Sequence, residues 1–173
     1  MEALFNHLSG LGHRRFVFAA DNLSGPHAHT AYVERRDALL ALAGGGACEV
    51  VDLGGDDAAV AAFADGFMLR AVGERPGAIM AASDGIAIKI AHALAARGGR
   101  VPLDVSVTGF DGGPEAADSF PPLTTWRPDW SAVGRLAMRT PLAVVQGEAV
   151  AARALVGGSL EVRQSTGAAL VRG

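Results

Sequence analysis

The sequence predicts an α/β domain in which helices cover both faces of a doubly wound, mostly parallel sheet. Four times along the chain a short apolar run is followed by a helical stretch, and this alternation is typical of parallel strands joined by right-handed crossovers. The run at 77–82 (GAIMAA) is apolar without interruption, as expected for a strand that is buried on both faces. Half of the 173 residues are apolar, which is enough for one well-buried domain, while the length is too short for two of ordinary size.

The individual strands are predicted from compact apolar runs between turn-forming residues. We expect strands over residues 15–20, 48–53, 77–82, 104–109 and 123–126. A last β-type run at 159–163 lies in a final stretch that differs from the βα units before it. That stretch contains a helix from about Ser131 that we expect to be interrupted at Pro141, and it is interpreted as an appendage.

The helices between the strands carry their own start and stop signals. A helix over 27–43 ends at the glycines 44–46. Asp56 and Asp57 begin the next helix, where carboxylates favour the positive end of the helix dipole. Ser83 and Asp84 begin a third, and a short fourth helix precedes Phe120.

Charge and composition exclude several classes of protein. The net charge is -3, with Lys+Arg 15 against Asp+Glu 18, and no basic face is evident, so direct binding of nucleic acid by this chain is not expected. The single cysteine, Cys48, lies in an apolar run and is predicted to be a buried thiol in a reducing compartment. The first residues do not resemble a signal peptide, and no run of about eighteen apolar residues is present. We therefore expect a soluble, cytoplasmic protein.

Ligand chemistry is expected at the carboxyl ends of the strands, where doubly wound sheets bind their ligands. Aspartates follow several strands there, and carboxylate acceptors beside helix N-termini suit a polyhydroxylated ligand. Asp84 is explained by its local role as a helix cap or first-turn residue, and Asp21 and Asp52 as turn formers that bond their own backbone. Asp111 differs, because a flexible loop follows it and no long helix immediately needs a cap.

Signatures of catalysis and of metal binding are missing from the sequence. It contains no G-x-S-x-G elbow, no G-x-x-x-x-G-K-[ST] loop and no G-x-G-x-x-G fingerprint. The close pair His27 and His29 lacks a cysteine or a fixed acidic partner, so it is a weak metal signal. We expect no enzyme, no catalytic residue, no metal and no cofactor.

Five motifs give the chain a recognisable resemblance. They are LGHRR at 11–15, AASDGIA at 81–87, VPLDVSVTGFD at 101–111, PPLTTWR at 121–127 and LEVRQST at 160–166. In this order and at this spacing they resemble the LacI/GalR family of bacterial transcription regulators. The resemblance runs over nearly the whole chain.

The resemblance implies a domain organisation and a function. Residues 1–127 would be the second lobe of a periplasmic-binding-protein-like effector domain, 128–150 a crossing helix that belongs with the first lobe, and 151–173 a return strand and tail. The helix-turn-helix headpiece and most of the first lobe lie outside the chain, so DNA would be bound only through that headpiece. The resemblance implies two partners: a small effector, expected to be a sugar, and a second copy in a homodimer. The alternatives are a sugar-binding transport receptor of the same fold, which the VPLDVSVTGFD motif disfavours, and an α/β enzyme.

The resemblance also implies site residues, with departures from the family pattern. Asp111 matches the aspartate that bonds effector hydroxyls, and Ser83 stands where many members have asparagine. The arginine that grips the effector falls on Ala31; Arg35, one turn later, is not assigned that role.

Three further positions match the pocket of the family. His27 falls on a pocket-lining position and could supply a donor, although a plain loop histidine explains it equally well. Leu53 falls where an aromatic residue often stacks on the sugar. Trp130 matches an aromatic residue at the lobe boundary and either takes that part or packs the crossing helix.

Overall fold

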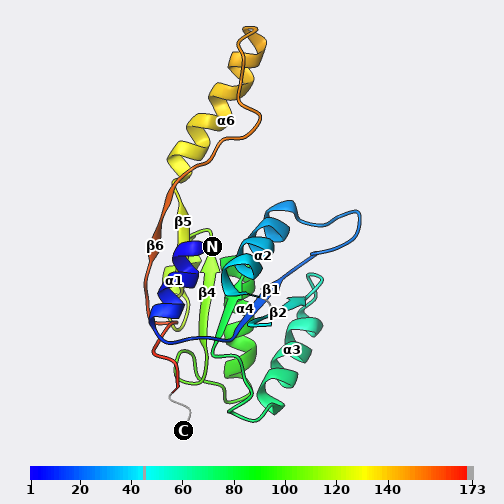
Figure 1. The fold of residues 1–173 in the computed structure, drawn as a ribbon, viewed down its shortest axis with the longest axis vertical. Coiled ribbons are helices and arrows are strands. Elements are labelled where there is room, and N and C mark those ends of the chain that lie inside the picture. Colours follow the sequence, from blue (N-terminus) through cyan, green and yellow to red (C-terminus); the bar gives the residue numbers. More distant parts are fainter. Residues whose placement is uncertain (45, 171–173) are drawn as a thin grey trace.

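Six strands form a single sheet in the order β2-β1-β3-β4-β5-β6 (Figure 1). The computed structural model describes residues 1–44 and 46–170. The strands are β1 (Phe16–Ala20), β2 (Cys48–Asp52), β3 (Ala78–Ala81), β4 (Ser106–Phe110), β5 (Thr124–Pro128) and β6 (Gly158–Glu161). The first five are mutually parallel, and β6 pairs antiparallel with β5. The predicted fold class is thereby confirmed.

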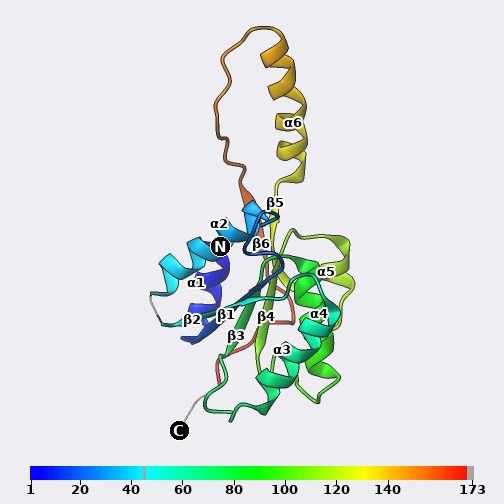
Figure 2. The ribbon, with the colours of Figure 1, turned by 90° about the vertical axis from the view of Figure 1, so that its right-hand side faces the viewer.

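Helices cover both faces of this sheet. They are α1 (Glu2–Gly10), α2 (Thr30–Ala43), α3 (Asp57–Leu69), α4 (Asp84–Ala95), α5 (Pro114–Asp118) and α6 (Trp130–Val145). Figure 2 shows α1 and α2 on one face and α3, α4 and α5 on the other. The sequence analysis did not predict α1, whose residues Leu4 and Leu8 are buried at the i, i+4 spacing of a helix.

The two central strands of the α/β core carry the most complete burial. Every residue of β1 and β3 is buried, which confirms the interpretation of the uninterrupted apolar run at 77–82. The edge strand β2 is more open, and Val50 is 41% exposed. Cys48 on this strand is half-buried rather than buried as predicted, because β2 is an edge strand of the sheet formed by the described residues. Burial still raises the pKa of its thiol to about 11.

Two helix boundaries differ from the prediction. Helix α2 begins at Thr30 rather than at residue 27, since the loop before it satisfies its own backbone: the His29 N–H donates to the Asn22 carbonyl at 2.9 Å. Helix α6 continues through Pro141 to Val145. The proline removes one backbone donor, but bonds from the residues after it, such as Gln146 N–H to the Leu142 carbonyl at 3.0 Å, carry the helix on.

Helix α6 projects away from the sheet, and the chain returns from it to β6 (Figures 1 and 2). It has no buried residue, and apolar side chains such as Met138 and Val145 are largely exposed. Within residues 1–44 and 46–170, no helix is both long enough and apolar enough to cross a membrane.

Candidate functional site at the carboxyl edge of the sheet

The connections reverse direction at β1, which has β2 on one side and β3 on the other. At such a switch point the loops after neighbouring strands lead away from each other, and a crevice forms outside the carboxyl ends. Helix α2 follows β1 here, and the segments after β3 and β4 lie on the neighbouring side. The candidate site is built from these three segments and from the start of α6.

Asp111 directly follows β4, and its backbone is held in an unusual conformation. Its φ is 118°, a region that residues with a side chain seldom adopt. Hydrogen bonds hold both polar groups of its backbone. The Asp111 N–H donates to the Trp126 carbonyl at 2.9 Å, and the Asp111 carbonyl accepts from the side-chain Nε1 of Trp130 at 2.8 Å. Strained residues that the surrounding structure holds in place are concentrated at functional sites.

The carboxylate of Asp111 is only partly satisfied within the protein. The side chain is 37% exposed, and Oδ1 lies 3.5 Å from Arg35 Nη2. Burial raises the pKa of the Asp111 carboxyl, whereas the nearby Arg35 guanidinium opposes that rise. An acceptor therefore remains available at the strand end.

Arg35 is the site residue that the sequence analysis left out. It reaches from α2 to donate a hydrogen bond to the Ala82 carbonyl, and its guanidinium lies 3.6 Å from the centre of the Phe110 ring. The side chain is 18% exposed. A signal was present in the sequence, because Arg35 stands four residues before the core residue Leu39 and therefore shares its inward face.

Asp84 stands in the first turn of α4, one of the two positions predicted for it, while the cap itself is Ser83. Ser83 is the N-cap of α4, with its hydroxyl accepting from Ile86 N–H at 3.4 Å. The buried Asp84 carboxylate instead accepts from the Thr125 hydroxyl at 2.6 Å and from Gly113 N–H at 3.0 Å. It thus ties the start of α4 to β5 and to the loop after Asp111.

Close packing and burial define the environment of Asp84. A Cβ at Gly109 would lie 2.3 Å from Asp84 Oδ1, so a residue without a side chain is needed there. Burial raises the pKa of the Asp84 carboxyl, and the Thr125 hydrogen bond opposes that rise.

Trp130 lies next to Asp111 at the first position of α6. Its indole is 50% exposed while its N–H is bonded to the Asp111 carbonyl. The same residue lines a polar groove of about 540 Å³ at the base of α6, together with Arg127, Asp129 and Glu161 among others. The ring can therefore present a face to a ligand while its nitrogen is held.

The remaining predicted site residues lie apart from Asp111. His27 is exposed in the loop before α2, and the structure shows no hydrogen bond from it to the residues described above. Leu53 is 2% exposed and belongs to the core, so its side chain is not accessible to a ligand in this arrangement. Asp52, interpreted as a turn former, accepts from Gly54 N–H at 3.0 Å and from Leu23 N–H at 2.8 Å.

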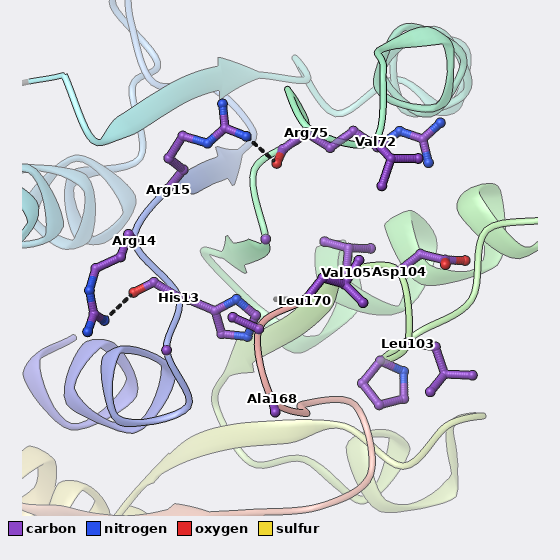
Figure 3. A pocket seen from close by; sticks show the side chains of 14 residues that line it. His13, Arg14, Arg15, Val72, Arg75, Leu103, Asp104, Val105, Ala168 and Leu170 are labelled. Carbon is purple, nitrogen blue, oxygen red and sulfur yellow. Dashed lines mark hydrogen bonds between the residues drawn. The ribbon is translucent and has the colours of Figure 1, made fainter. Parts of the chain in front are cut away.

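A second concavity, of about 210 Å³, opens at the opposite, amino edge of the sheet (Figure 3). Arginines around it donate to backbone carbonyls: Arg14 to His13 at 2.9 Å and Arg15 to Arg75 at 2.9 Å. Cations that satisfy carbonyl groups at this edge complement the negative ends of the helices. In the part of the chain that the structure describes, no cluster of metal-ligating side chains is found at either edge.

Comparison with known proteins agrees with this architecture. The model of the periplasmic binding protein-like domain matches residues 5–166. The lactose operon repressor of Escherichia coli (strain K12) is 29% identical over 166 residues, which are 92% of this chain and 44% of the repressor. The chain thus spans less than half of that relative.

Solved structures show the same likeness. A LacI family transcriptional regulator from Bifidobacterium animalis subsp. lactis superposes with a TM-score of 0.81 at 21% identity, over 98% of this chain and 61% of the other. A lac repressor dimer bound to operator and the anti-inducer ONPF superposes with a TM-score of 0.76 at 27% identity, over 95% and 56%. The chain therefore belongs to the family of periplasmic-binding-protein-like domains and is a partial effector-binding domain of a LacI-family transcription regulator.

Proposed function

We propose that this chain supplies one wall of a sugar-binding cleft, with the Asp111 carboxylate accepting hydrogen bonds from the hydroxyls of the effector. The observation that carries the proposal is the held backbone of Asp111 at the end of β4, together with a carboxylate that is 37% exposed and only loosely paired with Arg35. A charged acceptor forms stronger hydrogen bonds than a neutral one, so a single carboxylate can anchor a polyol.

Two neighbours complete the proposed wall. The exposed face of Trp130 offers an apolar surface for the C–H face of a sugar ring, a role for which Leu53 is too deeply buried. The Ser83 hydroxyl, although it caps α4, is partly exposed and can donate to a ligand oxygen while it accepts from Ile86 N–H.

The sugar would act by shifting the balance between two arrangements of lobes. In this proposal residues 1–127 are the second lobe, 128–150 cross to the first lobe through α6, and 151–173 return. A ligand bound between lobes changes their balance only by its different affinity for the two arrangements. Operator binding would respond in the cytoplasm through the helix-turn-helix headpiece of the whole regulator.

Pairing of two chains is part of the same proposal. Two headpieces in a homodimer match a palindromic operator. The similar lac repressor structure is a dimer bound to operator, and this supports the assignment. The named relatives are regulators rather than enzymes, which supports a sensing function.

Titration with neutral sugars tests the proposal, with tryptophan fluorescence and calorimetry as readouts. Because one wall of the cleft is present, we expect binding weaker than micromolar, and we expect Asp111→Ala to abolish it. Asp37→Ala is the matched control, since Asp37 is exposed on α2 and pairs with its neighbour Arg36 at 2.8 Å. Sugar binding that is equal in Asp111→Ala and wild type would contradict the site. Micromolar binding would contradict the need for a second lobe.

A further inference from the structure

The concavity at the amino edge of the sheet has an apolar mouth. Val72 and Leu103 are each 61% exposed and Leu170 is 49% exposed, and all three line this concavity of about 210 Å³ (Figure 3). They come from three segments far apart in the sequence: the loop after α3, the loop before β4 and the C-terminal segment. Apolar side chains that are exposed around one hollow form a single surface, which a ligand can cover.

The charged side chains that line the amino-edge concavity carry a surplus of positive charge. Among the described residues they are three arginines and one aspartate: Arg14, Arg15, Arg75 and Asp104. The aspartate is already compensated by Arg100, which donates to its two carboxylate oxygens at 2.8 and 3.0 Å. An anion that enters the concavity therefore meets more positive than negative charge.

Arg15 has donors that the protein does not use. A guanidinium carries five N–H groups. Both hydrogen bonds of Arg15, to the Gly73 carbonyl at 2.6 Å and to the Arg75 carbonyl at 2.9 Å, come from Nη2. Within residues 1–44 and 46–170, its Nε and Nη1 donate no hydrogen bond and no carboxylate pairs with it. The fixed Nη2 holds the side chain in place before a ligand arrives, which lowers the entropy cost of binding.

The two neighbours of Arg15 in the sequence have other tasks. Figure 3 shows Arg14 turned toward α1, where its Nη1 donates to the Ser9 carbonyl at 2.8 Å. His13 is 3% exposed, and its Nε2 donates to the Gly167 carbonyl at 3.0 Å, so Nδ1 is a bare acceptor. No hydrogen-bond partner of this Nδ1 is found among the described residues. The ring therefore offers an unpaired nitrogen at the wall of the amino-edge concavity.

We propose that the amino-edge concavity binds a compact carboxylate with a short apolar tail. The carboxylate accepts hydrogen bonds from Nε and Nη1 of Arg15, and the tail packs between Val72, Leu103 and Leu170. A volume of about 210 Å³ is below the roughly 300 Å³ at which pockets for drug-sized ligands begin, which favours a small metabolite. This site lies at the opposite edge of the sheet from Asp111 and does not depend on the function proposed there.

Four probes test the charge and the tail separately. They are isocaproate, its uncharged analogue isocaproamide, acetate and inorganic phosphate. Amide signals of residues 12–15, 75–77 and 102–105 are followed by NMR during each titration near neutral pH. We expect saturable shifts with isocaproate and about tenfold weaker binding of isocaproamide, because the amide lacks the charge that pairs with Arg15. Acetate and phosphate lack the apolar tail and should also bind at least about tenfold more weakly.

Three variants locate the binding. Arg15→Gln removes the cation and should weaken isocaproate binding by about tenfold, whereas Arg15→Lys keeps the charge and should lose less. Val72→Ser shortens the apolar mouth at an exposed position, so the fold should persist while the affinity falls a few-fold. Arg135→Gln is the matched control, since Arg135 is a 67% exposed arginine on α6 and should leave the affinity unchanged.

Every outcome supports or overturns the proposal. No saturable shift with isocaproate would overturn the site, and equal binding of isocaproate and isocaproamide would overturn the selection of an anion. Phosphate binding tighter than isocaproate would overturn the apolar tail. If Arg15→Gln fails to fold, Val72→Ser decides, because an unchanged isocaproate affinity in that variant contradicts the proposed contact.

Discussion

The two ends of the same parallel strands satisfy their polar groups in different ways. At the amino edge, His13 is 3% exposed, and its Nε2 lies 3.0 Å from both Ser106 Oγ and the Gly167 carbonyl, which fastens the C-terminal segment to the sheet. At the carboxyl edge, Asp111 is half-exposed, conformationally strained and loosely paired. The polar groups around His13 contribute to stability, whereas those around Asp111 remain available for a ligand. Substitutions at each edge test this contrast between the two edges.

The largest effect on stability is expected at the amino edge. His13→Ala removes the imidazole bonded to Ser106 and Gly167 and leaves a cavity, so the free energy of unfolding should fall by about 3 kcal/mol. His27→Ala at the exposed loop should change it by less than about 0.5 kcal/mol. Urea denaturation followed by circular dichroism measures both. Equal losses for the two histidines would remove the distinction between the edges.

A smaller loss of unfolding free energy is expected at the carboxyl edge, and it should differ between Asp84 and Asp111. Asp84→Ala leaves the Thr125 hydroxyl and Gly113 N–H without their buried partner, which should cost about 2 kcal/mol. Asp111→Asn keeps an acceptor at a half-exposed position and should cost less than about 1 kcal/mol. The same denaturation experiment compares them. A larger loss for Asp111→Asn would show that Asp111 is chiefly a structural residue.

Acid should act on the two edges in opposite directions. Burial lowers the pKa of His13 below its ordinary 6.5. Between the lowered pKa and pH 6.5, the unfolded chain therefore binds a proton that the folded chain does not. Its contribution to stability therefore falls as the pH drops through 6.5. Burial raises the pKa of Asp84 above 3.8, so the folded chain binds that proton first and gains stability as the pH falls through the raised pKa.

Unfolding free energies measured between pH 7 and pH 4 check these signs. His13→Asn should flatten the decline below pH 6.5 relative to wild type, and Asp84→Asn should remove the gain at lower pH. If both variants keep the wild-type pH dependence, burial at these two positions does not control the acid response.

The smallest effect is expected at Trp130. Trp130→Phe removes the donor to the Asp111 carbonyl but keeps a ring, and because that ring position is half-exposed the stability should change by a few tenths of a kcal/mol. Sugar affinity should fall by only a few-fold, whereas Trp130→Ala should weaken it further. Identical affinities for Phe and Ala would contradict ring stacking.

Much of the fold is local enough to be predicted from the sequence. Uninterrupted apolar runs located β1 and β3, because strands covered on both faces leave no polar alternation. Ser83 was placed correctly at the start of α4, since capping depends on a few neighbouring residues. The course of α6 through Pro141 was not predicted, because a proline inside a helix removes one backbone donor and was expected to interrupt it. The hydrogen bonds of the surrounding residues nevertheless continue the helix to Val145.

The sequence alone determined the order of the elements, the parallel core and the position of Asp111 at a strand end. Only the tertiary structure decided that Arg35 of α2 meets Asp111, and that Asp84, in the first turn of α4, joins this helix to β5. Periodicity reports which face of an element is buried, but it does not report which strand ends become neighbours. Those neighbours follow from the strand order. The strand order brings the end of β4 within reach of the long Arg35 side chain on α2.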